Sequence, residues 1–490
     1  MKKISKNVFY QTLYQIVITI TPLITAPYLA RVLGAEQQGI FSFRLSIVSY
    51  FVLFSVLGME TLGAKVISSK VKSEEERDKA FMKLAFVQSI ISSFFSFLYI
   101  AYCIVFVKNI LISWILVIQI IAYIFDFTWF FHGIQNFKIP SIINLLTRVA
   151  NVVFILVFVN AKNDLNIYAL IMSLTTFFSF TVQTLFVIKR VNFKNFALPN
   201  KTEFFLILKK SLILFLPIAA QTIYHVMDKT MLGSMSTFEQ TGYYYNVDKL
   251  ISIPVSVLAG VSTVMLPRVS ELISKGESDE AIREIKKSFF ILSWLSVGLC
   301  FGTISISDLL VPIFFGEEFL PCIFLTRLLS AIIVIKSMSI IIKTQYLIPF
   351  DKTKIFTISV AVGALVNVVV NFILIKNMGA TGAIIGTICA ETLSLMIQIV
   401  YFFKKEKNII ILLDLFMYII LGAIMAISLY FIPAISSKDY VNMIIKIIIG
   451  FAIYSFASAI YILLFRRQTF YETIGRASRR NNIDNNKTSD

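Results

Sequence analysis

The sequence predicts an all-α integral membrane protein with about fourteen transmembrane helices, which we expect to form two six-helix lobes around a central cavity and an added C-terminal helix pair. Composition is the first observation behind this prediction. Of the 490 residues, 57% are hydrophobic and only 15% are charged, unlike a soluble globular domain. The apolar runs are about 20 residues long, which matches a hydrocarbon core of about 30 Å. The third observation is a weak internal repeat between the two halves of the chain.

The apolar runs define the expected spans in order along the chain. They lie at residues 8–30, 40–63, 81–107, 110–131, 141–160, 165–188, 206–230, 248–268, 288–307, 320–343, 354–376, 380–403, 412–434 and 441–465. The strands of a β-barrel need only about half this length, so the spans are helices. The first run follows MKKISKN without an obvious small-residue cleavage site, so we expect it to be retained rather than removed as a signal peptide.

The positive charge of the chain follows this topology. The formal net charge is +17, and most of the 45 Lys and Arg fall in alternate connections: the N-terminus, residues 65–83, 189–210, 268–287, 352–354 and 404–407, and the tail after residue 465. Because cytoplasmic connections carry an excess of Lys and Arg, both termini are predicted to be cytoplasmic. We interpret the charge as a topology signal with some contact to anionic membrane lipids, and we expect no nucleic acid partner.

Neither the cysteines nor the connections point to an enzyme or a disulfide framework. The four cysteines lie within apolar runs without paired spacing: Cys103, Cys300, Cys322 and Cys389. The two histidines, His132 and His225, are far apart in the sequence. The longest connection predicted outside, around residues 234–246, is small and holds one carboxylate, Glu239. Function must therefore lie between the helices, and we expect a transporter with no catalytic residues.

The internal repeat relates the first and seventh spans. RVLGAEQQGIFSF follows the first span and TMLGSMSTFEQTGYYY follows the seventh, and both contain LG, then EQ, one residue and Gly, at an offset of about 200 residues. Six spans separate the copies, so they are parallel repeats. We therefore expect an N-lobe at residues 1–190, a C-lobe at 191–404, a helix pair at 405–465 and a cytoplasmic tail at 466–490.

Three stretches of the sequence resemble a known family. They are ARVLGAEQQGIFSF, DFTWFFHGIQNFKIP with Asp126, Trp129 and Gly133, and NFILIKNMGATGAIIGTICAE, and they are similar to junctions of the Wzx-type polysaccharide-repeat flippases of the multidrug, oligosaccharidyl-lipid and polysaccharide exporter superfamily. The resemblance implies a MATE-like fold, alternating access and export of undecaprenyl-diphosphate-linked sugar repeats for capsule or exopolysaccharide synthesis. It also implies the bacterial cytoplasmic membrane, with polysaccharide polymerase and glycosyltransferases as further partners.

Basic residues within the spans are candidates for binding a diphosphate. The substrate-binding candidates are Arg31, Arg44, Arg148, Lys229, Lys249 and Arg327, and Lys336 and Lys446 lie in similar positions. A centrally placed Arg or Lys costs about 2.5–3.5 kcal/mol on insertion scales, so most of these side chains must face a wet cavity, pair or reach the interface. A cationic cavity suits a diphosphate, since Arg offers paired planar donors to phosphate. The alternative is that Arg31, Lys249 and Lys446 extend to the interface from helix ends.

Polar residues in spans eleven and twelve are candidates for ion coupling. Asn367 and Asn371 are four residues apart and share one helix face, and Thr387 and Glu391 repeat this spacing. Sodium-coupled members of the superfamily use an aspartate on span seven, polar side chains one turn apart on span eleven and a threonine on span twelve. The resemblance therefore implies a Na⁺ site at Asp228, Asn367, Asn371 and Thr387. The oxygen ligands and single charge suit a monovalent cation. Alternatively these groups only join helices by hydrogen bonds, and Glu391 carries a proton or pairs with Lys336.

Other functions remain open from the sequence. A lipid II flippase would share the architecture and the carrier lipid. A multidrug cation exporter is disfavoured by the basic lumen, and an integral-membrane polysaccharide polymerase by the short outer connections. The sequence does not expose the sugar composition of the substrate.

Overall fold

The computed structural model describes residues 2–107, 110–195, 197–406 and 410–467, and within these ranges it is helical without a strand. The α-helices are α1 (Lys2–Val56), α2 (Met59–Ser69), α3 (Glu74–Tyr102), α4 (Leu111–Ala122), α5 (Thr128–Gly133), α6 (Lys138–Phe158), α7 (Leu165–Ile188), α8 (Lys201–Met235), α9 (Phe238–Ser274), α10 (Ser278–Phe315), α11 (Cys322–Leu329), α12 (Ala331–Ile341), α13 (Thr353–Met378), α14 (Ala380–Glu406), α15 (Ile410–Tyr430) and α16 (Asp439–Phe465). Short 3₁₀ segments lie at Tyr123–Phe125, Lys162–Asp164, Phe193–Asn195 and Glu317–Phe319, and π-helical segments at Cys103–Val107 and Ile342–Leu347.

The number of membrane helices agrees with the sequence. Among the described residues, twelve helical stretches are long and apolar enough to cross a membrane. The first of them, Ile20–Ser69, contains the end of the first predicted span and the whole of the second, and α1 breaks between them at Gly34, whose φ of 72° favours glycine. The 35-residue helix α8 corresponds to the predicted seventh span. With these two additions the described residues contain fourteen membrane helices, so the predicted fold class is confirmed.

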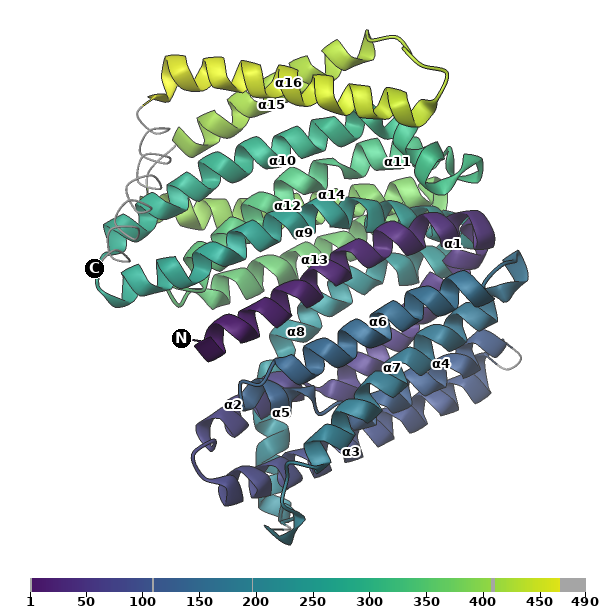
Figure 1. Ribbon diagram of the computed structural model, residues 1–490, viewed down its shortest axis with the longest axis vertical. Helices are drawn as coiled ribbons and strands as arrows, with labels where there is room; N and C mark the ends of the chain where they lie inside the picture. The colour runs from purple at the N-terminus through teal and green to yellow at the C-terminus, as the bar shows by residue number, and fades with distance from the viewer. Residues whose placement is uncertain (1, 108–109, 196, 407–409, 468–490) are drawn as a thin grey trace. The chain divides into compact units, whose positions relative to one another are not determined.

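Contacts divide the chain into two compact units. The first contains Met1–Lys249 and Asn367–Gly386, and the second contains Leu250–Val366 and Thr387–Asp490. In the first unit α1 packs against α3, α6 and α8, and α4 packs against α7. In the second unit α15 and α16 lie side by side along α10 (Figure 1). The lobe boundaries expected from the repeat stay predictions, and residues 468–490 of the expected tail lie outside the described residues.

One predicted connection is wrong. Residues 234–246 were expected to form a loop, but only Ser236 and Thr237 separate α8 from α9. The aromatic and polar residues that follow form the first turns of α9, with Thr237 accepting a hydrogen bond at its carbonyl from Thr241 N at 3.1 Å. Helix α9 therefore begins ten residues before the predicted eighth span, so Tyr244 and Tyr245 are helical residues.

The two copies of the repeat cross at their glycines. Gly39 lies so close to the carbonyl of Phe238 that a Cβ atom at Gly39 would stand 1.7 Å from that oxygen. Reciprocally, a Cβ at Gly242 would stand 1.9 Å from the carbonyl oxygen of Ala35. Gly39 and Gly242 occupy the same place in the two EQxG stretches, as do Ala35 and Phe238. The repeated glycine is therefore explained by a symmetric backbone contact within the first unit.

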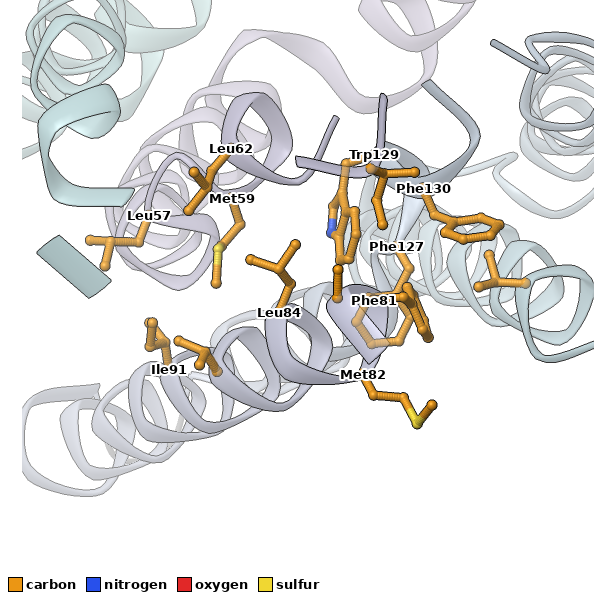
Figure 2. Close-up of a cluster of buried hydrophobic side chains, with 14 of the residues drawn as sticks. Leu57, Met59, Leu62, Phe81, Met82, Leu84, Ile91, Phe127, Trp129 and Phe130 are labelled. Atoms are coloured by element: carbon orange, nitrogen blue, oxygen red, sulfur yellow. The ribbon is translucent and has the colours of Figure 1, made fainter. Parts of the chain in front are cut away.

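The DFTWFF stretch organises a hydrophobic cluster of the first unit. Figure 2 shows the Trp129 indole standing over Phe81, with Leu62 on one side and Phe130 on the other. Trp129 Nε1 donates to Gln88 Oε1 at 2.7 Å, and Gln88 Nε2 donates to the Asp126 carbonyl at 2.8 Å. These contacts join α5 to α3, so this part of the family-like stretch has a structural explanation.

The two other motif residues also make close local contacts. The Asp126 carboxylate accepts from Thr128 Oγ1 at 2.6 Å, which fixes the start of α5. A Cβ at Gly133 would stand 2.6 Å from Ile67 Cβ, so this glycine allows α5 to approach α2. The geometry gives both residues a role in packing.

Candidate functional site

Three of the predicted ion-coupling residues meet in the first unit. Asn367 Nδ2 donates to Asp228 Oδ1 at 2.9 Å, and Asn371 Nδ2 donates to the same oxygen at 2.6 Å. Asn371 Nδ2 also lies 3.2 Å from Asn367 Oδ1. Asp228 is only 3% exposed and both asparagines are fully buried. The one-turn spacing on α13 therefore places both amides against one carboxylate of α8.

A fourth side chain completes this cluster. Tyr244, on α9, donates its hydroxyl to Asp228 Oδ2 at 2.5 Å. Sequence reasoning missed Tyr244, because it is the middle residue of a Tyr-Tyr-Tyr run and was assigned to a loop. The available signal was the helical register: once α9 begins at Phe238, successive tyrosines point about 100° apart and only one of them can face α8 at this level. We refer to Asp228, Tyr244, Asn367 and Asn371 as the carboxylate cluster.

The carboxylate cluster fits a monovalent cation by two observations. Asn371 Oδ1 is buried without a hydrogen-bond partner, so it is an acceptor that a ligand could satisfy. It lies close to Gly386, where a Cβ atom would stand 2.1 Å from it. The cluster also offers a carboxylate, amide oxygens and a phenol oxygen, which are the hard ligands that alkali and alkaline-earth cations prefer. Among the described residues no group of three or more His, Cys, Asp and Glu is placed to hold a metal, and a single carboxylate is better matched to one positive charge.

The remaining two ion-coupling candidates belong to the second unit. Thr387 and Glu391 are both buried. Lys336 Nζ lies 3.4 Å from Glu391 Oε1, so the ion pair considered as an alternative for Glu391 is present in the structure. The partly buried Lys336 supplies the opposite charge to this carboxylate within the second unit.

Removal of the Tyr244 hydroxyl is expected to destabilise the first unit. The Tyr244→Phe variant should lose about 2 kcal/mol of unfolding free energy, because a buried carboxylate loses a short charge-assisted hydrogen bond. Tyr243→Phe is a matched control: its hydroxyl donates to Glu239 at 2.6 Å, but Glu239 is exposed, so the loss should stay below about 1 kcal/mol. Unfolding of both variants in detergent measures the difference. Equal losses would show that Asp228 does not depend on Tyr244.

Several of the predicted substrate-binding cations gather around Tyr245. Lys249 Nζ lies 4.1 Å and Lys229 Nζ 5.7 Å from the centre of the Tyr245 ring. Lys229 also pairs with Asp248 at 2.9 Å. Arg148 and Lys229 both act electrostatically on Lys249, which places these three cations in one neighbourhood. We refer to Arg148, Lys229 and Lys249 as the cation group.

The other predicted cations are distributed differently. Arg44 lies on α1 with its guanidinium carbon 5.2 Å from the centre of the Phe43 ring, and Arg31 is exposed three residues before Gly34. Arg327 belongs to the second unit, where its Nε donates to Ser307 Oγ at 2.7 Å. Lys446, for which the sequence also allowed a position at the membrane interface, places its Nζ 3.8 Å from Asp308 Oδ2.

Two of the predicted arginines keep unused donors. The Nε atoms of Arg44 and Arg148 are buried and have no hydrogen-bond partner. A buried guanidinium N–H without an acceptor costs free energy that an anionic ligand can recover. The first unit therefore offers a concentration of positive charge with donors available to phosphate oxygens.

Comparisons with known proteins place these features in context. A family model described as "Polysaccharide biosynthesis protein" matches residues 4–273. A "Putative O-antigen transporter" of Escherichia coli (strain K12) is 22% identical over 404 residues, covering 81% of this chain and 96% of that protein. A "Probable low-salt glycan biosynthesis flippase Agl15" of Haloferax volcanii is 25% identical over 164 residues, covering 34% of each. Among solved structures, "Lipid II flippase MurJ, inward closed conformation" has a TM-score of 0.73 at 16% identity, covering 93% of this chain and 98% of that one.

Proposed function

Because the chain belongs to the polysaccharide biosynthesis protein family, whose model matches residues 4–273, we propose that it is a flippase for undecaprenyl-diphosphate-linked oligosaccharide repeat units, moving them from the cytoplasmic to the outer leaflet for cell-surface polysaccharide synthesis. The chain is a multi-pass membrane transporter of the multidrug, oligosaccharidyl-lipid and polysaccharide exporter superfamily, not an enzyme. The names of the O-antigen transporter and the glycan flippase support this substrate class. The observation that carries the proposal is the cation group.

The cation group is suited to the diphosphate of such a lipid. Lys229 is partly neutralised by Asp248, whereas Lys249 and Arg148 lie close enough to raise the local positive potential together. Arg148 has a buried donor without a partner, which a phosphate oxygen can satisfy. A cationic organic drug would be repelled by the same charges, so the multidrug exporter is the weaker candidate.

The proposed transport cycle uses the headgroup and the lipid tail separately. The diphosphate-sugar headgroup enters between the lobes from the cytoplasmic side of a bacterial plasma membrane, with both termini cytoplasmic, while the polyprenyl tail remains in lipid. Rocking of the lobes then exposes the headgroup on the other side. Outward movement of negative charge is favoured by an inside-negative potential, by about 2.3 kcal/mol per charge per 100 mV.

The carboxylate cluster is proposed to reset the empty carrier. Asp228, Asn367 and Asn371 are the residues of the first unit that would hold a sodium ion, and movement of the ion down its gradient would supply the energy for the reset. Without the ion, Asp228 is held by three donors, so the buried charge of the carboxylate is satisfied. Support for this role is the buried, unpartnered Asn371 Oδ1.

The flippase proposal is tested by flipping of a labelled undecaprenyl-diphosphate oligosaccharide in proteoliposomes. The Arg148→Gln variant should lower the rate by at least about tenfold, because one charge-assisted hydrogen bond to phosphate is worth roughly 1.5–3 kcal/mol. Arg268→Gln is the control, since Arg268 is partly exposed, belongs to the second unit and pairs with Glu271, its Nη1 lying 3.7 Å from Glu271 Oε2. Absence of flipping by the folded wild type with several sugars would refute the proposal. Flipping of lipid II in preference to the repeat-unit lipids would favour the lipid II alternative.

A further inference from the structure

A cavity of about 300 Å³, mainly apolar but with several polar side chains, lies within the first unit, and no residue of the carboxylate cluster lines it. It is bounded by the second half of α1, the start of α2, α4 with its following 3₁₀ turn, and α8. Its polar side chains are Ser49, Glu60, Gln119, Tyr123 and Thr222, and part of its apolar wall is formed by Val52, Val56, Ile218 and Val226. The volume is at the lower end of small-molecule sites, which run from about 300 to 1,000 Å³.

Two polar groups of the cavity wall, the Gln119 carbonyl oxygen and the Glu60 carboxylate, are hydrogen-bond acceptors. Gln119 Oε1 is buried and has no hydrogen-bond partner. The Glu60 side chain is 66% exposed, and its Oε1 lies 3.9 Å from His132 Nδ1, too far for a strong hydrogen bond. Glu60 is close enough to Tyr123 to act on it electrostatically. A ligand with O–H or N–H donors would therefore suit these two acceptors.

The chemistry of the walls favours a sugar ring over a phosphate. The Glu60 carboxylate repels an anion and accepts hydrogen bonds from hydroxyl or acetamido groups. The apolar side, with Val52 and Ile218, suits the C–H face of a pyranose. A sugar combines these two properties in one small ring, with polar edges and a less polar face.

The register of two helices connects the cavity with nearby cations. On α8, Thr222 and Val226 line the cavity, and Lys229 continues the same face one turn further. On α1, Arg44 precedes the lining residue Val48 by one turn. One turn is about 5.4 Å along a helix, a separation that a sugar and its adjoining phosphate can bridge.

The spacing between α1 and α8 is fixed at the end of the cavity nearer these cations. The hydroxyls of Tyr50 and Thr230 lie 3.1 Å apart, and Thr230 Oγ1 donates to Ser46 Oγ at 2.9 Å. These hydrogen bonds tie the two helices together beside Lys229, so the cavity and this cation keep a constant separation within the unit.

We propose that this cavity binds the sugar attached directly to the diphosphate, with Glu60 and Gln119 accepting hydrogen bonds from its hydroxyl or N–H groups and with Arg44 and Lys229 next to the phosphates. The inference rests on the proposed function, because it takes the substrate to be a lipid-linked oligosaccharide. It assigns the choice of the first sugar to residues of the first unit.

Binding to the full-length protein in nanodiscs tests the inference without transport. The probes are undecaprenyl diphosphate and the same lipid carrying N-acetylglucosamine, glucose or galactose. Wild type should bind at least one sugar-bearing lipid about tenfold more tightly than the sugar-free lipid, since tenfold corresponds to about 1.4 kcal/mol. Gln119→Leu and Glu60→Gln should each reduce this preference to about twofold or less. Thr222→Val replaces the hydroxyl of a cavity-lining threonine by a methyl group and should reduce the preference for the sugar-bearing lipid by a smaller factor. This variant tests the site if Gln119→Leu and Glu60→Gln fold poorly.

The control and the contrary outcomes separate this inference from the flippase proposal. Glu75→Gln removes an exposed carboxylate at the start of α3 and should leave both affinities unchanged. If wild type binds no sugar-bearing lipid better than undecaprenyl diphosphate, or if both variants keep the full preference, the sugar site is wrong. A preserved sugar preference in a protein that flips no lipid would instead remove the flippase proposal and leave the binding site.

Discussion

Sodium-dependent flipping is expected to fall about 100-fold in the Asp228→Asn variant. The substitution keeps the size of the side chain but removes the one negative charge on which Tyr244, Asn367 and Asn371 converge. An asparagine in this place also presents an N–H₂ group to neighbours that are already donors, so at least one buried donor loses its acceptor. Each lost hydrogen bond to a charged group is worth roughly 1.5–3 kcal/mol, and the loss of the charge removes the attraction for a cation.

Comparison of flipping with and without a sodium gradient distinguishes an ion site from a structural cluster. If the cluster binds sodium, sodium should stimulate flipping by the wild type and raise its unfolding temperature, and Asp228→Asn should lose both effects. Asp279→Asn is the matched control, because Asp279 is exposed in the first turn of α10. A folded Asp228→Asn protein that still responds to sodium would place the ion elsewhere and return the asparagines to helix packing.

The sequence supported a correct fold class because the strongest signals are local. Apolar runs of membrane length and alternating positive charge do not depend on tertiary contacts. The spacing of Asn367 and Asn371 likewise fixes a common helix face, and the structure shows both amides on Asp228. The partner helix was available only from the resemblance, since a span gives no indication of which distant span it faces.

Features that depend on tertiary geometry were harder to predict. The predicted connection of residues 234–246 is wrong because the chain turns within two residues, Ser236 and Thr237, before α9 begins. Consequently Tyr244 was left out of the candidate site. The cations show the same limit: their insertion cost indicates that they must avoid lipid, but only the structure shows that Lys229 and Lys249 lie around Tyr245.

Alanine in place of Gly39 or Gly242 is expected to destabilise the protein by more than about 3 kcal/mol. In each variant the new Cβ meets a backbone carbonyl oxygen, at 1.7 Å from Phe238 or 1.9 Å from Ala35, so no side-chain rotation can relieve the clash. Overpacking of a buried contact costs about 1–3 kcal/mol even where side chains can yield, and here two helices must separate. The two variants should be affected alike, because the contact is symmetric between the two copies of the repeat.

Gly260→Ala gives the opposite expectation for the same chemical change. Gly260 lies inside α9 with no atom within 4 Å of a Cβ placed there, so alanine should be neutral or stabilise the helix by up to about 1 kcal/mol. Unfolding in detergent compares the three variants. Tolerance of alanine at both Gly39 and Gly242 would mean that the helices do not approach at these glycines, and the repeat would then need another explanation. A loss of unfolding free energy at only one of the two glycines would show that the backbone contact is not symmetric, since the reciprocal contact requires both.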